Sequence, residues 1–228
     1  MNAVLDNLDA YFKAFGYTFF LFLVAGVLST VLGTVLLAMR VGPVAVLRGA
    51  AATYVTVVRN TPLVIMFAFF SFAAPIFGIK FNWLQVHVGT FDFTALFGAA
   101  VVSLTLYTSA FVCEGLRAGV NAVPLGQVEA ARAIGLPFGG VMSQVVLPQA
   151  FRAALPPLAS VQIALIKNTS VAAVFGVAEA TAQMRTFTNS FSSERLGIFV
   201  CFAVGYIVLV EAFSFLATRT ERHWRVAL

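Results

Sequence analysis

The segment AFGYTFFLFLVAGVLSTVLGTVLLAM, from Ala14 to Met39, contains no charged residue between Lys13 and Arg40. A helix needs about 20 mainly apolar residues to cross a bilayer core roughly 30 Å thick. The segment is therefore long enough to span a membrane with some tilt. It is not typical of a cleaved signal peptide, because Asp6 and Asp9 precede it in place of a basic region. We expect a retained membrane-spanning helix.

The composition of the whole chain is that of an integral membrane protein. Of its 228 residues, 61% are hydrophobic and 10% are charged. Soluble domains contain about 45–50% apolar and about 25% charged residues. So few charges cannot cover a water-soluble surface. The composition excludes a soluble globular protein and predicts a multi-pass protein of the plasma (cell) membrane.

Four further segments have the length of membrane-spanning helices. Their approximate ranges are 60–79, 93–113, 153–178 and 196–218. The last two each contain one ionisable residue, Lys167 and Glu211, which should be sheltered inside the protein. Thr61-Pro62 suits a helix start, although a kink at Pro62 in a helix that begins earlier would give the same pattern. With 14–39, the sequence predicts an all-α protein of about five spans in a single transmembrane domain, 1–228.

The distribution of basic residues predicts the orientation of the chain. An odd number of spans places the two termini on opposite sides. With the N-terminus outside, the inner segments hold Arg40, Arg48, Arg59, Arg117, Arg132, Arg152, Arg219, Arg222 and Arg225. The outer segments hold Lys13, Lys80, Arg185 and Arg195. Cytoplasmic segments are usually the more basic, so we expect a cytoplasmic C-terminus. The net charge of +5 is scattered beside lipid headgroups and does not indicate a nucleic-acid partner.

The sequence offers no catalytic residues, no metal site and no nucleotide-binding loop. His87 and His223 fall in different segments on opposite sides, so they cannot form a metal-ligand cluster. The three lysines, Lys13, Lys80 and Lys167, each follow a residue other than glycine, which excludes the Gly-Lys-Ser/Thr core of a phosphate-binding loop. We expect that this chain is not an enzyme and binds no cofactor. If ATP drives the protein, another chain binds the nucleotide.

The connection between the third and fourth predicted spans, about 119–150, is much longer than the few residues that usually join neighbouring helices. Pro124 and Gly135 predict the start and the end of a short helix within it. An apolar stripe at a spacing of three runs along this helix and consists of Leu125, Val128, Ala131 and Ile134. A second helical stretch, 138–146, is expected to end at Leu147-Pro148. From the residues alone, the two stretches could equally form an amphipathic hairpin on the membrane surface.

Motifs in this connection resemble a known family. Glu129-Ala130-Ala131, followed by Gly135 and then by Leu147-Pro148, is similar to the cytoplasmic EAA loop of permease subunits of binding-protein-dependent ABC importers. Three further motifs resemble the polar amino acid group of that family, which handles glutamate, glutamine, histidine and arginine. They are Arg59-Asn60-Thr61-Pro62-Leu63, Glu114-Gly115-Leu116-Arg117-Ala118-Gly119 leading to Gly126-Gln127, and Lys167-Asn168-Thr169-Ser170. The chain looks closest to the glutamate-type members.

The resemblance implies a type I ABC importer permease fold and import of a polar amino acid, glutamate or a relative, by alternating access. It implies that the loop forms a coupling helix that inserts into a groove on a cytoplasmic ATPase subunit. The residues expected to contact the ATPase are Gln127, Glu129, Ala130, Ala131, Arg132, Ile134 and Gly135. Further implied partners are a pair of ATP-binding subunits that bind ATP and Mg, a second permease subunit that is identical or homologous, and an extracytoplasmic amino-acid-binding protein. The binding protein would dock on the outer connections, about 80–92 and 183–195.

A lone amine marks a candidate substrate pathway. Lys167 falls near the middle of the fourth predicted span, where a charge costs about 2.5–3.5 kcal/mol on insertion scales. At 100° per residue, Ser160, Lys167 and Ser170 share one side of the helix, while Gln162 and Thr169 share the opposite side. Such a helix is surrounded by protein rather than by lipid. The candidate substrate-pathway residues are Lys167, Asn168, Thr169 and Ser170.

Two questions stay open on the residues alone. Lys167 could bind substrate, or it could lock the bundle by pairing with Glu114, Glu179 or Glu211. The three polar residues after Lys167 could offer hydrogen bonds to a zwitterion or bond back to their own helix. A channel or secondary-transporter subunit without an ATPase is the alternative function. Five spans do not divide into the two repeats usual in secondary transporters, and neither alternative explains the coupling-type loop.

Overall fold

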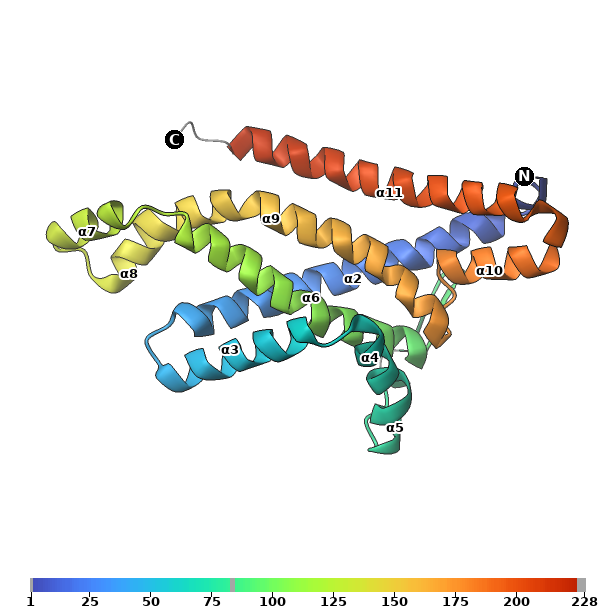
Figure 1. Cartoon of the computed structure of the whole chain (residues 1–228), viewed down its shortest axis with the longest axis horizontal. Coiled ribbons are helices and arrows are strands. Elements are labelled where there is room, and N and C mark those ends of the chain that lie inside the picture. Colours follow the sequence, from blue (N-terminus) through green and yellow to red (C-terminus); the bar gives the residue numbers. More distant parts are fainter. Residues whose placement is uncertain (1, 83–84, 225–228) are drawn as a thin grey trace.

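The computed structural model describes residues 2–82 and 85–224, and shows an elongated bundle of helices (Figure 1). Arg225 and residues 83–84, which the sequence analysis assigned to the inner side and to an outer connection, lie outside the described residues. The N-terminus and α10 (Ala180–Ser190) lie at one end of the bundle, and α7 (Leu125–Ala133) lies at the other. We call these the α10 end and the α7 end.

The remaining elements follow one another along the chain as helices interrupted by one small hairpin. They are α1 (Asn2–Leu5), α2 (Leu8–Val41), α3 (Ala45–Asn60), α4 (Leu63–Ala68), a π-helix (Phe69–Ala73), α5 (Ala74–Ile76), β1 (Val86–Val88), β2 (Phe91–Phe93), α6 (Ala95–Asn121), α8 (Phe138–Gly140), a π-helix (Val141–Val146), α9 (Leu147–Asn168), a 3-10 helix (Thr169–Phe175), a 3-10 helix (Ser192–Glu194) and α11 (Arg195–Trp224). The two strands pair antiparallel, with His87 opposite Asp92.

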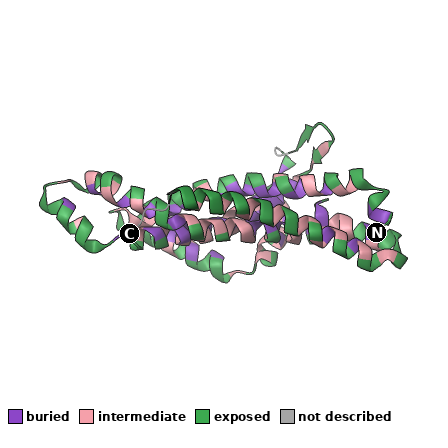
Figure 2. Ribbon diagram, turned by 90° about the horizontal axis from the view of Figure 1, so that it is seen from above, coloured by how far each residue is buried: buried purple, intermediate pink, exposed green. Residues whose placement is uncertain are grey.

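Four helical stretches in the described residues are long and apolar enough to cross a membrane: 8–41, 95–121, 138–175 and 192–223. Each corresponds to one of the predicted spans 14–39, 93–113, 153–178 and 196–218. The helices extend beyond the uncharged windows because charged residues at a helix end can lie at the level of the lipid headgroups. Many apolar side chains on the outer faces of α2 and α11 are exposed, which suits contact with lipid (Figure 2).

The predicted span 60–79 is broken. A helix that begins earlier, α3, ends at Asn60, and the chain then turns by 102° into the segment Leu63–Ile76. Thr61 takes an extended conformation, as a residue before proline usually does, and Pro62 cannot continue the hydrogen-bond ladder of α3. Counted as one bent element, α3 and the segment after Pro62 make a fifth span. The break is therefore the kink at Pro62 in a longer element, and a straight helix over 60–79 is wrong.

The core lies where α2, α6 and α9 run side by side (Figure 1). Leu21, Leu104 and Leu165, one from each helix, are fully buried in one cluster. Close approach depends on small residues: a Cβ at Gly119 of α6 would lie 2.3 Å from the carbonyl oxygen of Ala150 on α9. Buried residues follow the lines where the helices meet, whereas the α7 end is mostly exposed (Figure 2). The bundle thus buries its apolar faces along its middle and leaves α7 uncovered.

A buried carboxylate ties three elements together near the α10 end. Glu179 caps the start of α10 by accepting from the backbone N–H of Ala182 at 2.9 Å. It also accepts from the hydroxyl of Tyr206 on α11 at 2.7 Å and from that of Thr18 on α2 at 3.4 Å. Burial raises the pKa of the Glu179 carboxyl, and these hydrogen bonds oppose the shift. Glu179 is therefore already engaged in joining α2, α10 and α11.

Candidate functional site

Helix α7 begins and ends where the sequence predicts. Pro124 is its N-cap residue, and Gly135 follows its C-cap with φ +89°. The N–H of Gly135 donates to the carbonyl of Arg132 at 3.0 Å, and the N–H of Leu136 donates to that of Ala131 at 3.2 Å. This pair of bonds is the Schellman arrangement, which needs a left-handed residue at the position of Gly135. The glycine thus ends α7 for a local backbone reason.

The apolar stripe of α7 divides between two environments. Ala131 is buried against the second π-helix and the start of α9, and Val128 is half-buried there. Leu125 and Ile134 point away and are 76% and 80% exposed. Two apolar side chains this exposed, on a helix with a well-defined end, suit binding in a groove on a partner.

Most of the predicted contact residues are exposed. Those exposed are Gln127, Glu129, Ala130, Arg132, Ile134 and Gly135. Ala131 differs, because its side chain packs inward and is only 6% exposed. Gln127 also accepts from the side-chain amide of Gln149 at 2.6 Å, which fastens α7 to α9. In this chain Ala131 therefore holds α7 in place rather than offering a contact.

The stretch after α7 does not end at Leu147-Pro148. It passes through the π-helix Val141–Val146 directly into α9. Pro148 has no N–H and would clash with a carbonyl in a regular helix interior. The wider turn of a π-helix just before Pro148 relaxes this constraint. The second half of the predicted hairpin is thus the beginning of the long helix that continues into the membrane-spanning stretch.

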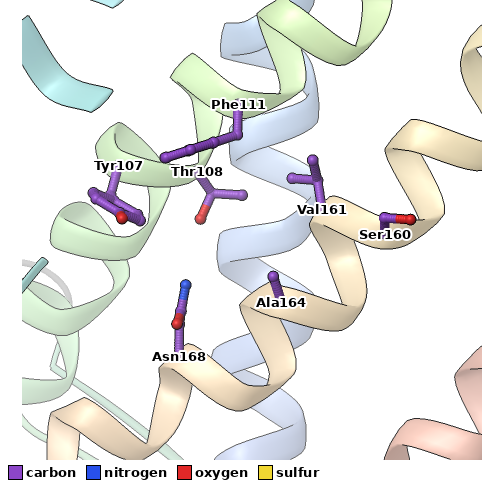
Figure 3. Close-up of a pocket in the computed structure, with 7 residues that line it drawn as sticks. All are labelled: Tyr107, Thr108, Phe111, Ser160, Val161, Ala164 and Asn168. Atoms are coloured by element: carbon purple, nitrogen blue, oxygen red, sulfur yellow. The ribbon is translucent and has the colours of Figure 1, made fainter. Parts of the chain in front are cut away.

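A pocket of about 260 Å³ lies between α6 and α9 (Figure 3). Its lining residues are Tyr107, Thr108, Phe111, Ser160, Val161, Ala164 and Asn168. The wall is mainly apolar and carries a few polar groups, which is the usual composition of a small-molecule site. In the close-up, the side chains of Thr108 and Asn168 point toward one another across the space between the two helices (Figure 3). No acidic or basic side chain lines this pocket.

Two of the polar groups in the pocket, on Thr108 and Asn168, face one another and have no partner among the described residues. The hydroxyl of Thr108 is buried, and within the described part of the chain it has no hydrogen-bond partner. The side-chain amide of Asn168 also has no hydrogen bond among the described residues. The Ser160 hydroxyl, by contrast, donates to the carbonyl of Pro156 at 3.1 Å. A buried polar group without a partner is costly, so a ligand that pairs with the Thr108 hydroxyl would remove a penalty.

The four candidate residues from Lys167 to Ser170 differ in their burial and in their hydrogen bonds. The hydroxyls of Thr169 and Ser170 bond back to the carbonyls of Ile166 at 2.7 Å and of Lys167 at 2.6 Å. Thr169 is fully buried, and Asn168 alone lines the pocket. Lys167 lies next to it in the last turn of α9. Because the 3-10 helix and the π-helix extend this stretch to 138–175, Lys167 lies toward its α10 end and not near its middle.

Neither ionisable residue of the last two predicted spans is sheltered by this chain, since Lys167 and Glu211 are both exposed. No ion pair joins Lys167 to a carboxylate in the residues that the structure describes. Glu114 pairs with arginines, and Glu179 is bound by Tyr206 and Thr18. The opposite side of α9 does face protein, because the Gln162 amide donates to the Thr30 hydroxyl of α2 at 3.0 Å. Among the described residues, a bundle lock through Lys167 therefore has no partner.

The sequence analysis missed most of the pocket. Tyr107, Thr108 and Phe111 lie in a long uncharged stretch, where apolar and weakly polar residues alternate without a motif. The available signal was Thr108 itself, because a hydroxyl inside a predicted span must find a partner. Its position opposite Asn168, sixty residues later in the chain, follows only from the packing of α6 on α9.

Comparison with known proteins identifies the class of protein. The family described as binding-protein-dependent transport system inner membrane component matches residues 27–226, and the chain belongs to this family. The chain is 42% identical over 200 residues to the glutamate transport system permease protein GluC of Corynebacterium efficiens, covering 86% of each chain. It is 30% identical over 228 residues to the probable glutamine ABC transporter permease protein GlnM of Bacillus subtilis, covering 98% of this chain and 99% of that one.

A solved structure supports the same class. A chain in the crystal structure of an amino acid ABC transporter with histidines superposes with a TM-score of 0.84 at 26% identity, covering 96% of both chains. The protein is thus a multi-pass membrane permease with the all-α type I ABC permease fold. The predicted family, membrane location and fold are confirmed. The orientation of the termini stays a prediction.

Proposed function

We propose that this chain is the membrane-spanning subunit of an ATP-driven importer of a polar amino acid, glutamate or a relative, and that the pocket between α6 and α9 receives the substrate. The observation that carries the proposal is the pair of unpartnered polar groups, Thr108 and Asn168, that face one another in a mainly apolar cavity. The names of the relatives GluC and GlnM support an acidic or amide amino acid.

The rest of the assembly follows from the two ends of the bundle. In the proposal, the α7 end is cytoplasmic and the exposed side chains of Leu125 and Ile134 enter a groove on an ATPase subunit. A pair of such subunits binds ATP and Mg and drives alternating access. A second permease subunit, identical or homologous, completes the pathway and shelters Lys167. At the α10 end, the β1–β2 hairpin and α10 lie in the connections where an amino-acid-binding protein would dock.

Reconstitution tests this function against the alternative of a channel or secondary transporter. The chain is purified with its ATPase and placed in proteoliposomes with ATP inside and the binding protein outside. We expect uptake of glutamate or glutamine that requires ATP and accelerates ATP hydrolysis. Uptake of the same size without ATP would contradict the proposal and favour the alternative.

The Thr108 hydroxyl provides a direct test of the pocket. Thr108→Val keeps the branched shape and removes a buried hydroxyl that has no partner. The melting temperature should therefore stay the same or rise. If the hydroxyl binds substrate, the KM for uptake should rise about threefold to tenfold, the value of a neutral hydrogen bond.

Thr105→Val is the matched control for this test. Thr105 lies one turn earlier on α6, its hydroxyl also has no partner in the described residues, and it does not line the pocket. We expect a normal KM in this variant. Equal KM values for wild type and Thr108→Val would exclude Thr108 from the substrate site.

A further inference from the structure

Four charged side chains meet one helical turn from the pocket, on the side toward α7. They are Arg40 at the end of α2, Arg59 at the end of α3, and Glu114 and Arg117 on α6. Three guanidinium groups surround one carboxylate, so the cluster has a formal net charge of +2. The cluster joins three helices and carries more cations than its single anion can neutralise.

Glu114 is satisfied without Arg59. It accepts from Arg40, and it accepts from the Nη2 and Nε of Arg117 at 3.0 Å and 3.2 Å. The nearest atom of Arg59 lies 3.9 Å from the carboxylate, beyond hydrogen-bond distance. The Arg40 side chain is 16% exposed, whereas that of Arg59 is 46% exposed. Arg59 is therefore the surplus cation, and within the described residues its donors make no hydrogen bond.

Arg59 does not line the pocket but lies next to one residue of its wall. Its guanidinium carbon lies 5.7 Å from the centre of the Phe111 ring, and Phe111 forms part of the pocket wall. A guanidinium within about 6 Å of an aromatic face is attracted to it. Its flat fork of donors matches a carboxylate better than any other side chain does. No acidic side chain lines the pocket to compete for it.

From this geometry we propose that Arg59 binds a carboxylate of the substrate beside Phe111, while Glu114 stays paired with Arg40 and Arg117. The inference rests on the proposed function, and it names the anionic group that the pocket selects. Glutamate presents two carboxylates, one on its side chain and one on its α-carbon. Glutamine presents only the α-carboxylate, so a comparison of the two substrates shows which carboxylate Arg59 binds.

The test compares uptake of glutamate and glutamine by the complete complex carrying Arg59→Gln. Loss of a charge-assisted hydrogen bond should raise KM roughly tenfold to hundredfold. A rise for glutamate alone assigns Arg59 to the side-chain carboxylate, and an equal rise for both assigns it to the α-carboxylate. Both KM values are measured on the same variant, so the comparison between glutamate and glutamine does not depend on how much complex is recovered.

Two further variants separate binding from stability. Arg48→Gln is the matched control, because Arg48 is exposed on the same helix and donates to the carbonyl of Gly42, far from Glu114 in the chain. We expect normal KM values there. Arg59→Lys keeps the charge and should restore part of the affinity. If wild type transports and Arg59→Gln has normal KM values for both substrates, this inference is overturned while the proposed function stands. If wild type takes up no amino acid, both are overturned.

Discussion

Replacing Gly135 by valine is expected to remove most of the ATP hydrolysis that substrate stimulates in the reconstituted complex. Gly135 has φ +89° and completes the Schellman arrangement at the end of α7. A β-branched residue is strongly disfavoured there. Strain of this kind costs about 1–3 kcal/mol, so the native end of α7 would be depopulated roughly tenfold to hundredfold. The measurement is stimulated ATPase activity at equal membrane abundance.

The control for Gly135 lies on the same helix. Gly126 also has open space where a Cβ would be, but its φ is not positive. Gly126→Val therefore makes the same chemical change without backbone strain, and we expect it to keep most of the stimulated activity. Because a Cβ at either position meets no atom within 4 Å, a difference between the variants points to the turn. If substrate stimulates ATP hydrolysis equally in wild type and in Gly135→Val, the end of α7 at Gly135 has no role in coupling.

Lys167→Met is expected to reduce uptake about tenfold to hundredfold while leaving the melting temperature of the complex nearly unchanged. Methionine keeps much of the side-chain volume and removes the charge. Lys167 is exposed beside Asn168 and has no ion-pair partner in the described residues, so its loss strands none of their carboxylates. If the amine binds a substrate carboxylate, a charge-assisted hydrogen bond is lost. Uptake and thermal melting are measured on the same preparation.

Lys13→Met controls for the loss of a positive charge, since Lys13 is exposed near the start of α2 and lies outside the two connections proposed to dock the binding protein. We expect normal uptake and normal melting in that variant. A large fall in the melting temperature of Lys167→Met would instead indicate a lock with a carboxylate of the second permease subunit. Normal uptake together with normal melting would exclude both roles and leave Lys167 as a side chain that lines a wet cavity.

Local features of the chain were sufficient to predict four of its spanning stretches and the ends of α7. The uncharged run from Ala14 to Met39 requires a spanning helix whatever surrounds it, because backbone groups in lipid must be satisfied within the segment. Pro124 and Gly135 set the limits of α7 through their own backbone conformations. The EAA motif and its spacing indicated the family, and the comparisons confirm it.

Contacts between distant segments decided the rest. Pro62 sets where α3 ends, but the 102° angle of the turn and the helical passage through Pro148 depend on neighbours that a pattern of residues does not specify. Glu114 pairs with Arg40 across a separation of 74 residues, which leaves Lys167 without that partner. The pocket exists only because α6 and α9 pack at one register and bring Thr108 opposite Asn168. The length of an uncharged run, its charges and the backbone conformation of a residue are local properties, which the sequence alone predicts. The pairing of distant side chains and the enclosure of a pocket arise only when separate helices pack.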